Sequence, residues 1–524
     1  MSQFLILTAM VWFVPFTLQA QSATRHSLSE AVKEVTELPR YKTSHWGMLV
    51  VDAVNGEVLL DHQSDKFFAP ASCTKLFSVA AALESLGPDF RFRTPLVHTG
   101  KLDEANKTLQ GDLILVASGD LTMGGRTLPD GTIEFANNDH TYANGSTRGQ
   151  LTSVDPLQGL NQLARQLAEK VKSIEGEIIV DDRLFERAES TGSGPGRLTP
   201  ILINDNLIDF TITPAEKVGE PAKIEYRPKG SAIHVDAQVN TVAAEENGKA
   251  VKPVITMVAQ QYGRYVVRGT IPEKHKPLVR VKEVDDPASH ARSLLIDALR
   301  KAGVQVKTSS LAVNPHEKLP ASDAVKNLPR LVELESSPFS ENAKLILKVS
   351  HNLHASTLPL LMAAQKQQQT LNQGMRLQGQ ALKRIGVPLD SVIFGGGAGG
   401  ARADHVTPRA AVTLLKQMAQ REDGKPFRQA LPIVGVDGTT AVSVNKDSPA
   451  RGKFQAKTGT LSWSNGMQNN SIMTSKALSG YGETAKGRQI IFAFFVNHAM
   501  IGETGTEQAG KDLGRLCEIV FQME

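Results

Sequence analysis

Cysteine, aromatic residues and long apolar runs are scarce in this sequence. Two cysteines occur among 524 residues, which is too few for a disulfide framework. Aromatic residues make up 5% of the chain and are not interleaved with clusters of basic residues, so we expect no nucleic-acid partner. The histidines are scattered and form no His-Glu-x-x-His pattern, so we expect no metal and no organic cofactor.

The first 20 residues carry no charge and are mostly apolar. Pro15 interrupts this short segment and Ala20 is a plausible cleavage site, so we predict a secretory signal peptide at residues 1–20, although the usual Lys or Arg near its start is missing. After it, the longest apolar run is residues 490–496, well short of the ~20 residues that span a bilayer. The mature chain is therefore expected to be periplasmic or secreted, with no membrane span.

Length and charge narrow the remaining possibilities. A chain of 524 residues is long for one hydrophobic core, so two or three domains are expected. The 58 basic and 54 acidic residues give a net charge of +4, which is mild and spread along the sequence. The oligomeric state stays open.

A serine and a lysine stand three residues apart at the start of a predicted helix. Ala69-Pro70-Ala71 leads into the apolar run 76–83, which stops at Gly87-Pro88, and this pattern predicts one helix of about four turns. Residues three apart share a helix face, so Lys75 should lie beside Ser72. A serine hydroxyl needs a base, and lysine is a base only when burial or a nearby positive charge lowers its pKa. Alone, the pair is more typical of a helix start with an exposed lysine than of a catalytic site.

Lys457-Thr458-Gly459 follows residues 452–456, whose alternating pattern predicts a strand. On an edge strand, Gly459 would let a ligand backbone approach closely. Lys457 and the hydroxyls of Thr458 and Thr460 could then bind a carboxylate. The alternative is an ordinary strand with a solvated lysine.

Ser350-His351-Asn352 lies between predicted helices at 341–349 and 353–364. A serine and an asparagine at such a break are commonly helix caps. Taken together, however, the three motifs supply a nucleophile, a base, a hydroxyl and amide pair, and a second lysine. This set is the equipment of an active-site serine acyl-transferase.

With these motifs the sequence resembles the low-molecular-mass class C penicillin-binding proteins, the D-alanyl-D-alanine carboxypeptidase/endopeptidase family. The resemblance covers nearly the whole mature chain. About 275 residues separate Lys75 from Ser350, a spacing that implies a large insertion between the first two motifs. Other stretches that carry the resemblance are Ser118-Gly119-Asp120, residues 176–181, residues 206–209, residues 431–439 and Gly480-Tyr481.

The resemblance implies an α/β (α+β) fold of the serine penicillin-recognising type, with an antiparallel sheet covered by helices. We expect the transpeptidase-like catalytic domain in residues 21–95 and 328–524. The insertion is expected to form a second domain from residues 96–211 and 282–327. A small β-rich third domain is predicted at residues 212–281, where short β-type runs alternate with Gly and Pro.

The resemblance also implies roles for the motif residues. Ser72 would be the nucleophile and Lys75 its base, while Ser350 and Asn352 would relay protons and orient the substrate amide. Cys73, one residue from the nucleophile, is about 100° around the helix from the Ser72 face and is expected to face the core.

Substrate binding is implied for a second set of residues. Lys457 and Thr458 would bind a terminal D-alanine carboxylate, and the backbone N–H groups of Ser72 and Thr460 would form the oxyanion hole. Asp181 and Arg402 would lie near the pocket for the substrate side chain.

The function that the resemblance implies is a D-alanyl-D-alanine peptidase, a carboxypeptidase or endopeptidase acting on peptidoglycan stem peptides through a serine acyl-enzyme. β-Lactams should acylate Ser72 as substrate mimics. Two alternatives stay open: a β-lactamase or esterase of the same superfold, which would turn penicillin over, and a catalytically silent wall-binding homologue, which a fluorescent penicillin would not label.

Three departures from the family pattern affect these expectations. Residues 396–401 are glycine and alanine only, where relatives carry an acid and two serines. About ten extra residues between Leu461 and Gly480 could cover or narrow the cleft. His351 stands where Asp is common, and it could titrate near neutrality or simply point away from the cleft.

Overall fold

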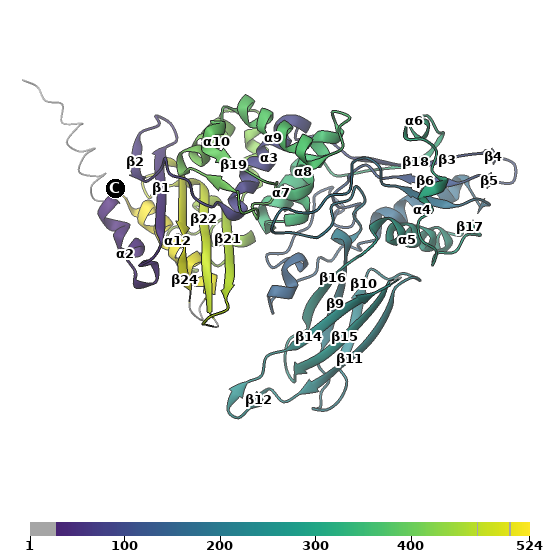
Figure 1. Cartoon of the computed structure of the whole chain (residues 1–524), viewed down its shortest axis with the longest axis horizontal. Coiled ribbons are helices and arrows are strands. Elements are labelled where there is room, and N and C mark those ends of the chain that lie inside the picture. The colour runs from purple at the N-terminus through teal and green to yellow at the C-terminus, as the bar shows by residue number, and fades with distance from the viewer. Residues whose placement is uncertain (1–27, 262, 469, 502–504, 524) are drawn as a thin grey trace, which may run out of the picture.

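The structure is a computed structural model that describes residues 28–523 except residues 262, 469 and 502–504. The predicted signal peptide at residues 1–20 lies outside the described residues. None of the described helices combines the length and apolar character needed to cross a membrane. Figure 1 shows a first lobe built from both ends of the chain, a second lobe beside it, and a narrow third lobe that projects away from both.

The first lobe contains an antiparallel sheet whose edge strand carries the Lys-Thr-Gly motif. In spatial order its main path is β2, β1, β23, β22 and β21, and each neighbouring pair runs antiparallel. The strands are β1 (His45–Asp52), β2 (Val58–His62), β21 (Phe454–Asn465), β22 (Asn470–Glu483) and β23 (Gln489–Asn497), with β24 (Ala499–Ile501) paired to the start of β22.

Helices cover both faces of this sheet (Figure 1). Ile491, Ala493 and Phe495 of β23 face a cluster of helices, while Phe492 and Phe494 face the opposite cluster. The first cluster contains α3 (Thr74–Leu86), α7 (Phe339–Val349), α8 (Asn352–Ala364), α9 (Leu371–Ile385), α10 (Pro408–Ala419) and α11 (Gly424–Gln429), and the second contains α2 (Lys33–Thr36) and α12 (Gly505–Gln522). The predicted class, an antiparallel sheet covered by helices, is confirmed.

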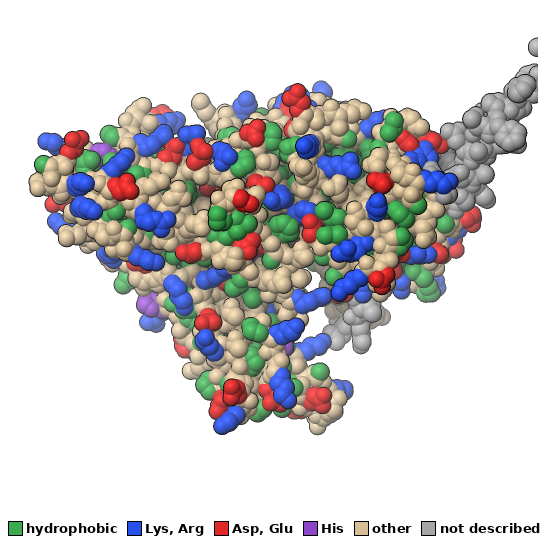
Figure 2. Space-filling model, turned by 180° about the vertical axis from the view of Figure 1, so that it is seen from behind, with side chains coloured by type: hydrophobic (Ala, Val, Ile, Leu, Met, Phe, Trp, Pro, Cys, Tyr) green, Lys and Arg blue, Asp and Glu red, His purple; other side chains and the backbone are tan. Residues whose placement is uncertain are grey.

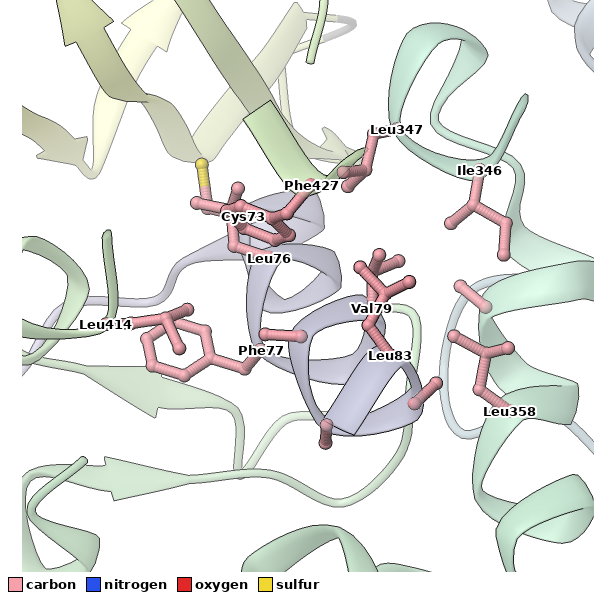
Figure 3. Close-up of a cluster of buried hydrophobic side chains, with 14 of the residues drawn as sticks. Cys73, Leu76, Phe77, Val79, Leu83, Ile346, Leu347, Leu358, Leu414 and Phe427 are labelled. Carbon is pink, nitrogen blue, oxygen red and sulfur yellow. The ribbon is translucent and has the colours of Figure 1, made fainter. Parts of the chain in front are cut away.

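Helix α3 lies in the middle of the first cluster. Every residue from Thr74 to Leu83 is buried, as expected for a helix that is apolar on all sides. In Figure 3 the side chains of α3 are surrounded by Leu347 of α7, Leu358 of α8 and Leu414 of α10. This packing fixes the position of the turn just before α3 relative to the sheet.

The extra residues after Leu461 lengthen the sheet. β21 and β22 stay paired as far as Asn465 and Asn470, with one register shift between Leu461 and Ser462. The segment therefore forms the end of a long hairpin. The sequence had left open that it could cover or narrow the cleft.

The second lobe is entered through β3 and left through β18, which pair antiparallel. Its two sheets have the orders β18-β3-β6-β8 and β17-β7-β5-β4, and its helices are α4 (Gln158–Lys170), α5 (Pro287–Lys301) and α6 (Ser322–Val325). The strands are β3 (Arg93–His98), β4 (Lys101–Asp103), β5 (Thr108–Gln110), β6 (Leu113–Val116), β7 (Ser173–Ile174), β8 (Ile178–Asp181), β17 (Gln305–Val306) and β18 (Arg330–Glu335).

The third lobe consists of strands within residues 207–283. They form the sheets β10-β9-β16 and β11-β15-β14 and the small pair β12-β13, and their apolar side chains join the core of the second lobe. Acidic and basic side chains are intermixed over the face shown in Figure 2. The strands are β9 (Leu207–Thr213), β10 (Lys223–Arg227), β11 (His234–Val242), β12 (Glu245–Glu246), β13 (Lys249–Ala250), β14 (Val254–Gln260), β15 (Arg264–Pro272) and β16 (Leu278–Glu283). The division of the chain into three folding units stays a prediction.

A long irregular stretch between β6 and α4, residues 117–157, returns from the second lobe to the first. We call it the crossing segment. Asn137 Oδ1 accepts a hydrogen bond from the Gly438 N–H at 2.7 Å, and the Ile133 N–H donates to Glu341 of α7 at 2.9 Å. The first lobe is therefore held by a segment that belongs to the insertion.

Buried charges hold the crossing segment in place. The Arg126 guanidinium donates to Asp139 at 2.7 Å and to Asp205 at 2.8 Å. His140 contacts Asp209 at 2.6 Å and Asp205 at 2.9 Å. Burial opposes the charge of His140, but the carboxylates of Asp209 and Asp139 outweigh it and raise its pKa to about 10. We refer to these five side chains as the buried charge cluster.

Replacing Arg126 by Met should strongly destabilise the protein. The change leaves Asp139 and Asp205 buried without their guanidinium, and removing one partner of a buried ion pair typically costs about 3–5 kcal/mol. Thermal unfolding of the purified variant measures the loss as a lower unfolding temperature.

Arg93→Met is the matched control, because the Arg93 side chain is 62% exposed and pairs with Glu333 and Glu335 at the surface. Its effect should stay below about 1 kcal/mol. Equal unfolding temperatures for the two variants would show that the cluster does not stabilise the fold.

Candidate active site

Ser72 lies in a single 3-10 turn, Ala71–Cys73, directly before α3. Two glycines allow neighbouring backbone to pack on this turn. A Cβ added at Gly459 would collide with the Pro70 carbonyl oxygen, and one at Gly399, whose φ is +89°, would collide with the Ala71 carbonyl oxygen. Gly459 thus permits close approach of the protein's own backbone at Pro70, whereas the sequence predicts close approach of a ligand backbone.

Lys75 is fully buried and reaches back to the nucleophile. Its Nζ lies 2.8 Å from Ser72 Oγ, 2.7 Å from Asn352 Oδ1 and 2.8 Å from the Ala398 carbonyl oxygen. Burial and then the positive charge of Lys457 hold the pKa of Lys75 well below its usual value. A neutral amine has two hydrogens, which suit the Asn352 and Ala398 oxygens, and one lone pair that is left for the Ser72 proton.

Ser350 occupies the break between α7 and α8 in a left-handed conformation, with φ +64° and ψ +40°. Its Oγ accepts a hydrogen bond from Lys457 Nζ at 2.9 Å, and its carbonyl oxygen accepts one from the Tyr142 hydroxyl of the crossing segment. A non-glycine residue in this region costs on the order of 1 kcal/mol. The contact from Tyr142 fixes the strained backbone in the place where Ser350 meets Lys457.

Lys457 is buried on the face of β21 that meets the turn before α3. Besides Ser350, it donates to the Thr458 carbonyl oxygen at 2.7 Å. Burial lowers its pKa to about 8. The structure therefore brings together the five residues that the sequence analysis assigned to catalysis: Ser72, Lys75, Ser350, Asn352 and Lys457.

A cavity of about 550 Å³ opens in front of these groups. Ser72, Ser350 and Asn352 line it from the helices, and Thr458 and Thr460 line it from β21. Residues of the crossing segment form the opposite wall: Asn137, Asn138, Asp139, Tyr142, Ser146, Arg148 and Gly149. No motif in the sequence indicates this wall.

Two further polar residues meet the threonines of β21. Thr439 Oγ1 lies 2.7 Å from Thr458 Oγ1, and Lys476 Nζ donates to Thr460 Oγ1 at 3.0 Å. Neither was assigned from the sequence. The pairing of Thr460 with Lys476 across β21 and β22 depends on strand register, which the sequence alone did not give.

Cys73 is fully buried, and its Sγ lies 3.2 Å from the Lys457 carbonyl oxygen. Figure 3 shows the sulfur directed from α3 toward the strands. Burial raises the pKa of the thiol to about 11, so it stays protonated. The expectation that Cys73 faces the core is confirmed.

The glycine-rich residues 396–401 pack against α3 through their backbone. The Gly397 carbonyl oxygen accepts a hydrogen bond from Ser78 at 2.7 Å. Asp404 accepts hydrogen bonds from the N–H groups of Gly395 and Ala401 at 2.8 and 2.9 Å, and burial raises its pKa to about 6. Because these contacts use main-chain atoms, the missing acid and serines leave the environment of Lys75 intact.

Asp181 and Arg402 are not brought to the cavity. Asp181 ends β8 in the second lobe, where both carboxylate oxygens accept hydrogen bonds from Arg183 at 2.8 Å. Arg402 is exposed in a turn, and neither side chain is among the residues that line the cavity. Their role in recognising a substrate side chain stays a prediction, without support from this geometry.

His351 points away from the cavity into the buried charge cluster. Asp205, His351 and His354 place ligand-type atoms within 4.8 Å of one another, which makes the group a candidate metal site. The two imidazole rings are stacked 3.7 Å apart with 17° between their planes, so their lone pairs run nearly parallel and do not converge. His354 Nε2 and Arg126 already contact the two oxygens of Asp205 at 2.7 and 2.8 Å. The arrangement fits a hydrogen-bond network better than a metal centre.

The chain is similar to curated relatives and to solved structures along most of its length. The chain is 25% identical over 475 residues to the D-alanyl-D-alanine carboxypeptidase DacB of Haemophilus influenzae, covering 88% of this chain and 87% of that one. It is 27% identical over 466 residues to a D-alanyl-D-alanine carboxypeptidase of Actinomadura sp., covering 86% and 79%.

The fold is similar to the crystal structure of penicillin-binding protein 4 from H. influenzae. The TM-score is 0.70 at 22% identity, and the match covers 94% of this chain and 99% of that one. A second structure of the same protein, in complex with a β-lactam, matches with a TM-score of 0.66. Residues 28–516 match the model of one protein family. The chain therefore belongs to the D-Ala-D-Ala carboxypeptidase 3 (S13) family, as the resemblance in its three motifs predicted.

Proposed function

We propose that this protein is a serine D-alanyl-D-alanine peptidase that acts on the stem peptides of peptidoglycan. The observation that carries the proposal is the position of Lys75 Nζ, 2.8 Å from Ser72 Oγ in a fully buried site. Burial makes this lysine a base at neutral pH, which the nucleophile requires.

In the acylation step, Ser72 Oγ attacks the carbonyl carbon of the penultimate D-alanine, and the hydroxyl proton moves to Lys75 Nζ. The negative charge that develops on the carbonyl oxygen is bound by the backbone N–H groups of Ser72 and Thr460. A pre-oriented donor of this kind typically contributes about 2.7–4 kcal/mol. Asn352, which is already hydrogen-bonded to Lys75, orients the substrate amide.

Collapse of this intermediate breaks the peptide bond. The proton that Lys75 took from Ser72 passes through Ser350 Oγ, which Lys457 holds at 2.9 Å, to the leaving nitrogen, and the terminal residue departs as a free amine. Water then attacks the acyl carbon and gives a proton to Lys75. The ester bond to Ser72 breaks, the shortened peptide leaves as a free acid, and Ser72 Oγ regains its proton from Lys75. If the leaving amine belongs to a cross-linked diamino acid, the same steps make the enzyme an endopeptidase.

β-Lactams are expected to acylate Ser72 by the same attack on an amide carbonyl. The relative from H. influenzae has been solved with a β-lactam, which supports this expectation. We place the enzyme in the periplasm or outside the cell, on the basis of the apolar segment at residues 1–20. The intact catalytic set gives no support to a catalytically silent wall-binding protein.

Incubating the purified protein with defined muropeptides tests the proposal directly. Pentapeptides ending in D-Ala-D-Ala should lose D-alanine, and cross-linked dimers should show whether endopeptidase activity accompanies it. A protein that binds these muropeptides without cleaving either kind would contradict the proposal.

Ser72→Ala should abolish covalent labelling by fluorescent penicillin, because the change removes the attacking oxygen. Cys73→Ser should leave labelling largely intact, because the buried thiol takes no part in the attack. Gel fluorescence after denaturation measures both. Labelling that survives in Ser72→Ala and disappears in Cys73→Ser would reverse the assignment of the nucleophile.

The two motif lysines should respond differently to replacement by arginine. Lys75→Arg should be as inactive as Lys75→Ala, because a guanidinium stays protonated and cannot accept the Ser72 proton. Lys457→Arg keeps the positive charge and should retain part of the activity. Rates of acylation by a β-lactam measure this difference, and near wild-type acylation by Lys75→Arg would exclude Lys75 as the base.

The acylation rate should rise with pH, level off, and fall again above pH about 8. The rise follows deprotonation of Lys75, whose lowered pKa places this limb on the acidic side. The fall follows the loss of positive charge from Lys457 and Lys476, whose pKa values burial lowers to about 8. Second-order rate constants between pH 5 and 10 test this, and a rate that keeps rising to pH 10 would show that neither charge is needed.

A further inference from the structure

The cavity contains a lysine that belongs to none of the three motifs. Lys476 lies on β22, its side chain is buried with 8% of its surface exposed, and its Nζ donates to Thr460 Oγ1 at 3.0 Å. Among the described residues no carboxylate forms an ion pair with it. It is a buried cation whose only bonded partner there is a neutral hydroxyl.

The motif lysines do not line the cavity but lie behind hydroxyls that do, since Lys75 contacts Ser72 and Lys457 contacts Ser350. Successive side chains of a strand point to opposite faces, so Lys457 and Gly459 lie on the face of β21 that meets the turn before α3, and Thr458 and Thr460 lie on the other face. Among the residues that the structure describes, Lys75 and Lys457 are both absent from the cavity lining. The Lys457 ammonium already donates hydrogen bonds within the protein, to Ser350 Oγ and to the Thr458 carbonyl oxygen.

Lys476 is on the same side as the two threonine hydroxyls. It pairs with Thr460 across the β21–β22 ladder, and directly opposed residues of antiparallel strands point to the same face. Lys476 lines the cavity together with Thr458 and Thr460. Lys476 is therefore the lysine that lies beside the two threonine hydroxyls lining the cavity.

Within the part of the chain that the structure describes, no carboxylate neutralises the charge of Lys476 by direct contact. Among the described carboxylates, the one whose charge acts on Lys476 is Glu507 on α12, which also lines the cavity but forms an ion pair with Arg148 of the crossing segment at 3.0 Å. A buried ammonium without a counter-ion is costly. A negatively charged ligand group in the cavity would supply the missing partner.

We propose that Lys476 is the counter-charge for the free α-carboxylate of the leaving residue, which sits on the hydroxyls of Thr458 and Thr460. This inference rests on the proposed peptidase function. In such a substrate only the amide nitrogen and one Cα separate the scissile carbonyl from the carboxylate, so a carboxylate held beside Thr460 stays within reach of Ser72 in the same cavity. The site selects peptides with a free terminal carboxylate, while Lys457 acts on Ser350 and Lys75.

The test compares one peptide ending in D-Ala-D-Ala with its C-terminal carboxamide. Wild-type enzyme should prefer the free acid. Lys476→Met should lose about ten- to a hundredfold in kcat/KM on the acid, mainly through KM, the usual size of a charge-assisted hydrogen bond. Its activity on the amide should stay within about twofold, since the amide offers no charge for Lys476 to bind. Lys476→Arg should recover much of the preference.

A structural role for Lys476 would give a different pattern. Removing an unpaired buried charge should leave the unfolding temperature unchanged or raise it, so a loss of folding is not expected in Lys476→Met. Lys453→Met is the control, because Lys453 is a surface residue just before β21 whose partner is Glu483 at 3.4 Å. It should change neither substrate.

Equal losses of Lys476→Met on acid and amide, or no loss on either, would overturn the carboxylate role while leaving the peptidase function in place. A wild-type enzyme that cleaves neither peptide and is not labelled by penicillin would overturn the proposed function itself. Acylation by a penicillin and by its methyl ester provides a second measurement, in which Lys476→Met should slow the acid far more than the ester.

Discussion

The whole site depends on keeping one lysine neutral. Lys75 can accept a proton only because it is enclosed, and enclosing it requires that α3 be buried along most of its length. That burial constrains two other elements. β21 and the loop at 396–401 must approach the turn before α3 closely enough to exclude water, and Gly459 and Gly399 provide the space. The positive charge of Lys457 then adds to the effect of burial on the pKa of Lys75.

Much of this arrangement could be predicted because it is encoded locally. The spacing of Ser72 and Lys75 fixes their common face as soon as a helix begins there, and proline and glycine mark where that helix starts and stops. The alternating residues 452–456 indicate the strand that carries Lys457. The resemblance then supplied the order of the lobes and the fold class.

What the sequence did not give are contacts that depend on register and on charge pairing between distant segments. Lys476 stands opposite Thr460 only because β21 and β22 pair with one register shift. The sequence left open that the residues after Leu461 cover the cleft. In the structure they continue the pairing of β21 with β22 as a hairpin. The crossing segment has no regular secondary structure over most of its length. Its sequence therefore shows no helix or strand periodicity that would indicate that Arg126 and His140 are buried.

The crossing segment makes the insertion part of the catalytic machinery. It forms one wall of the cavity, and through Tyr142 it holds the backbone of Ser350 in its strained conformation. The first lobe is thus not a self-sufficient enzyme with two appended domains. Shortening the chain to a minimal peptidase by excising the insertion would leave the nucleophile and its base in place and dismantle the surface on which their substrate is positioned.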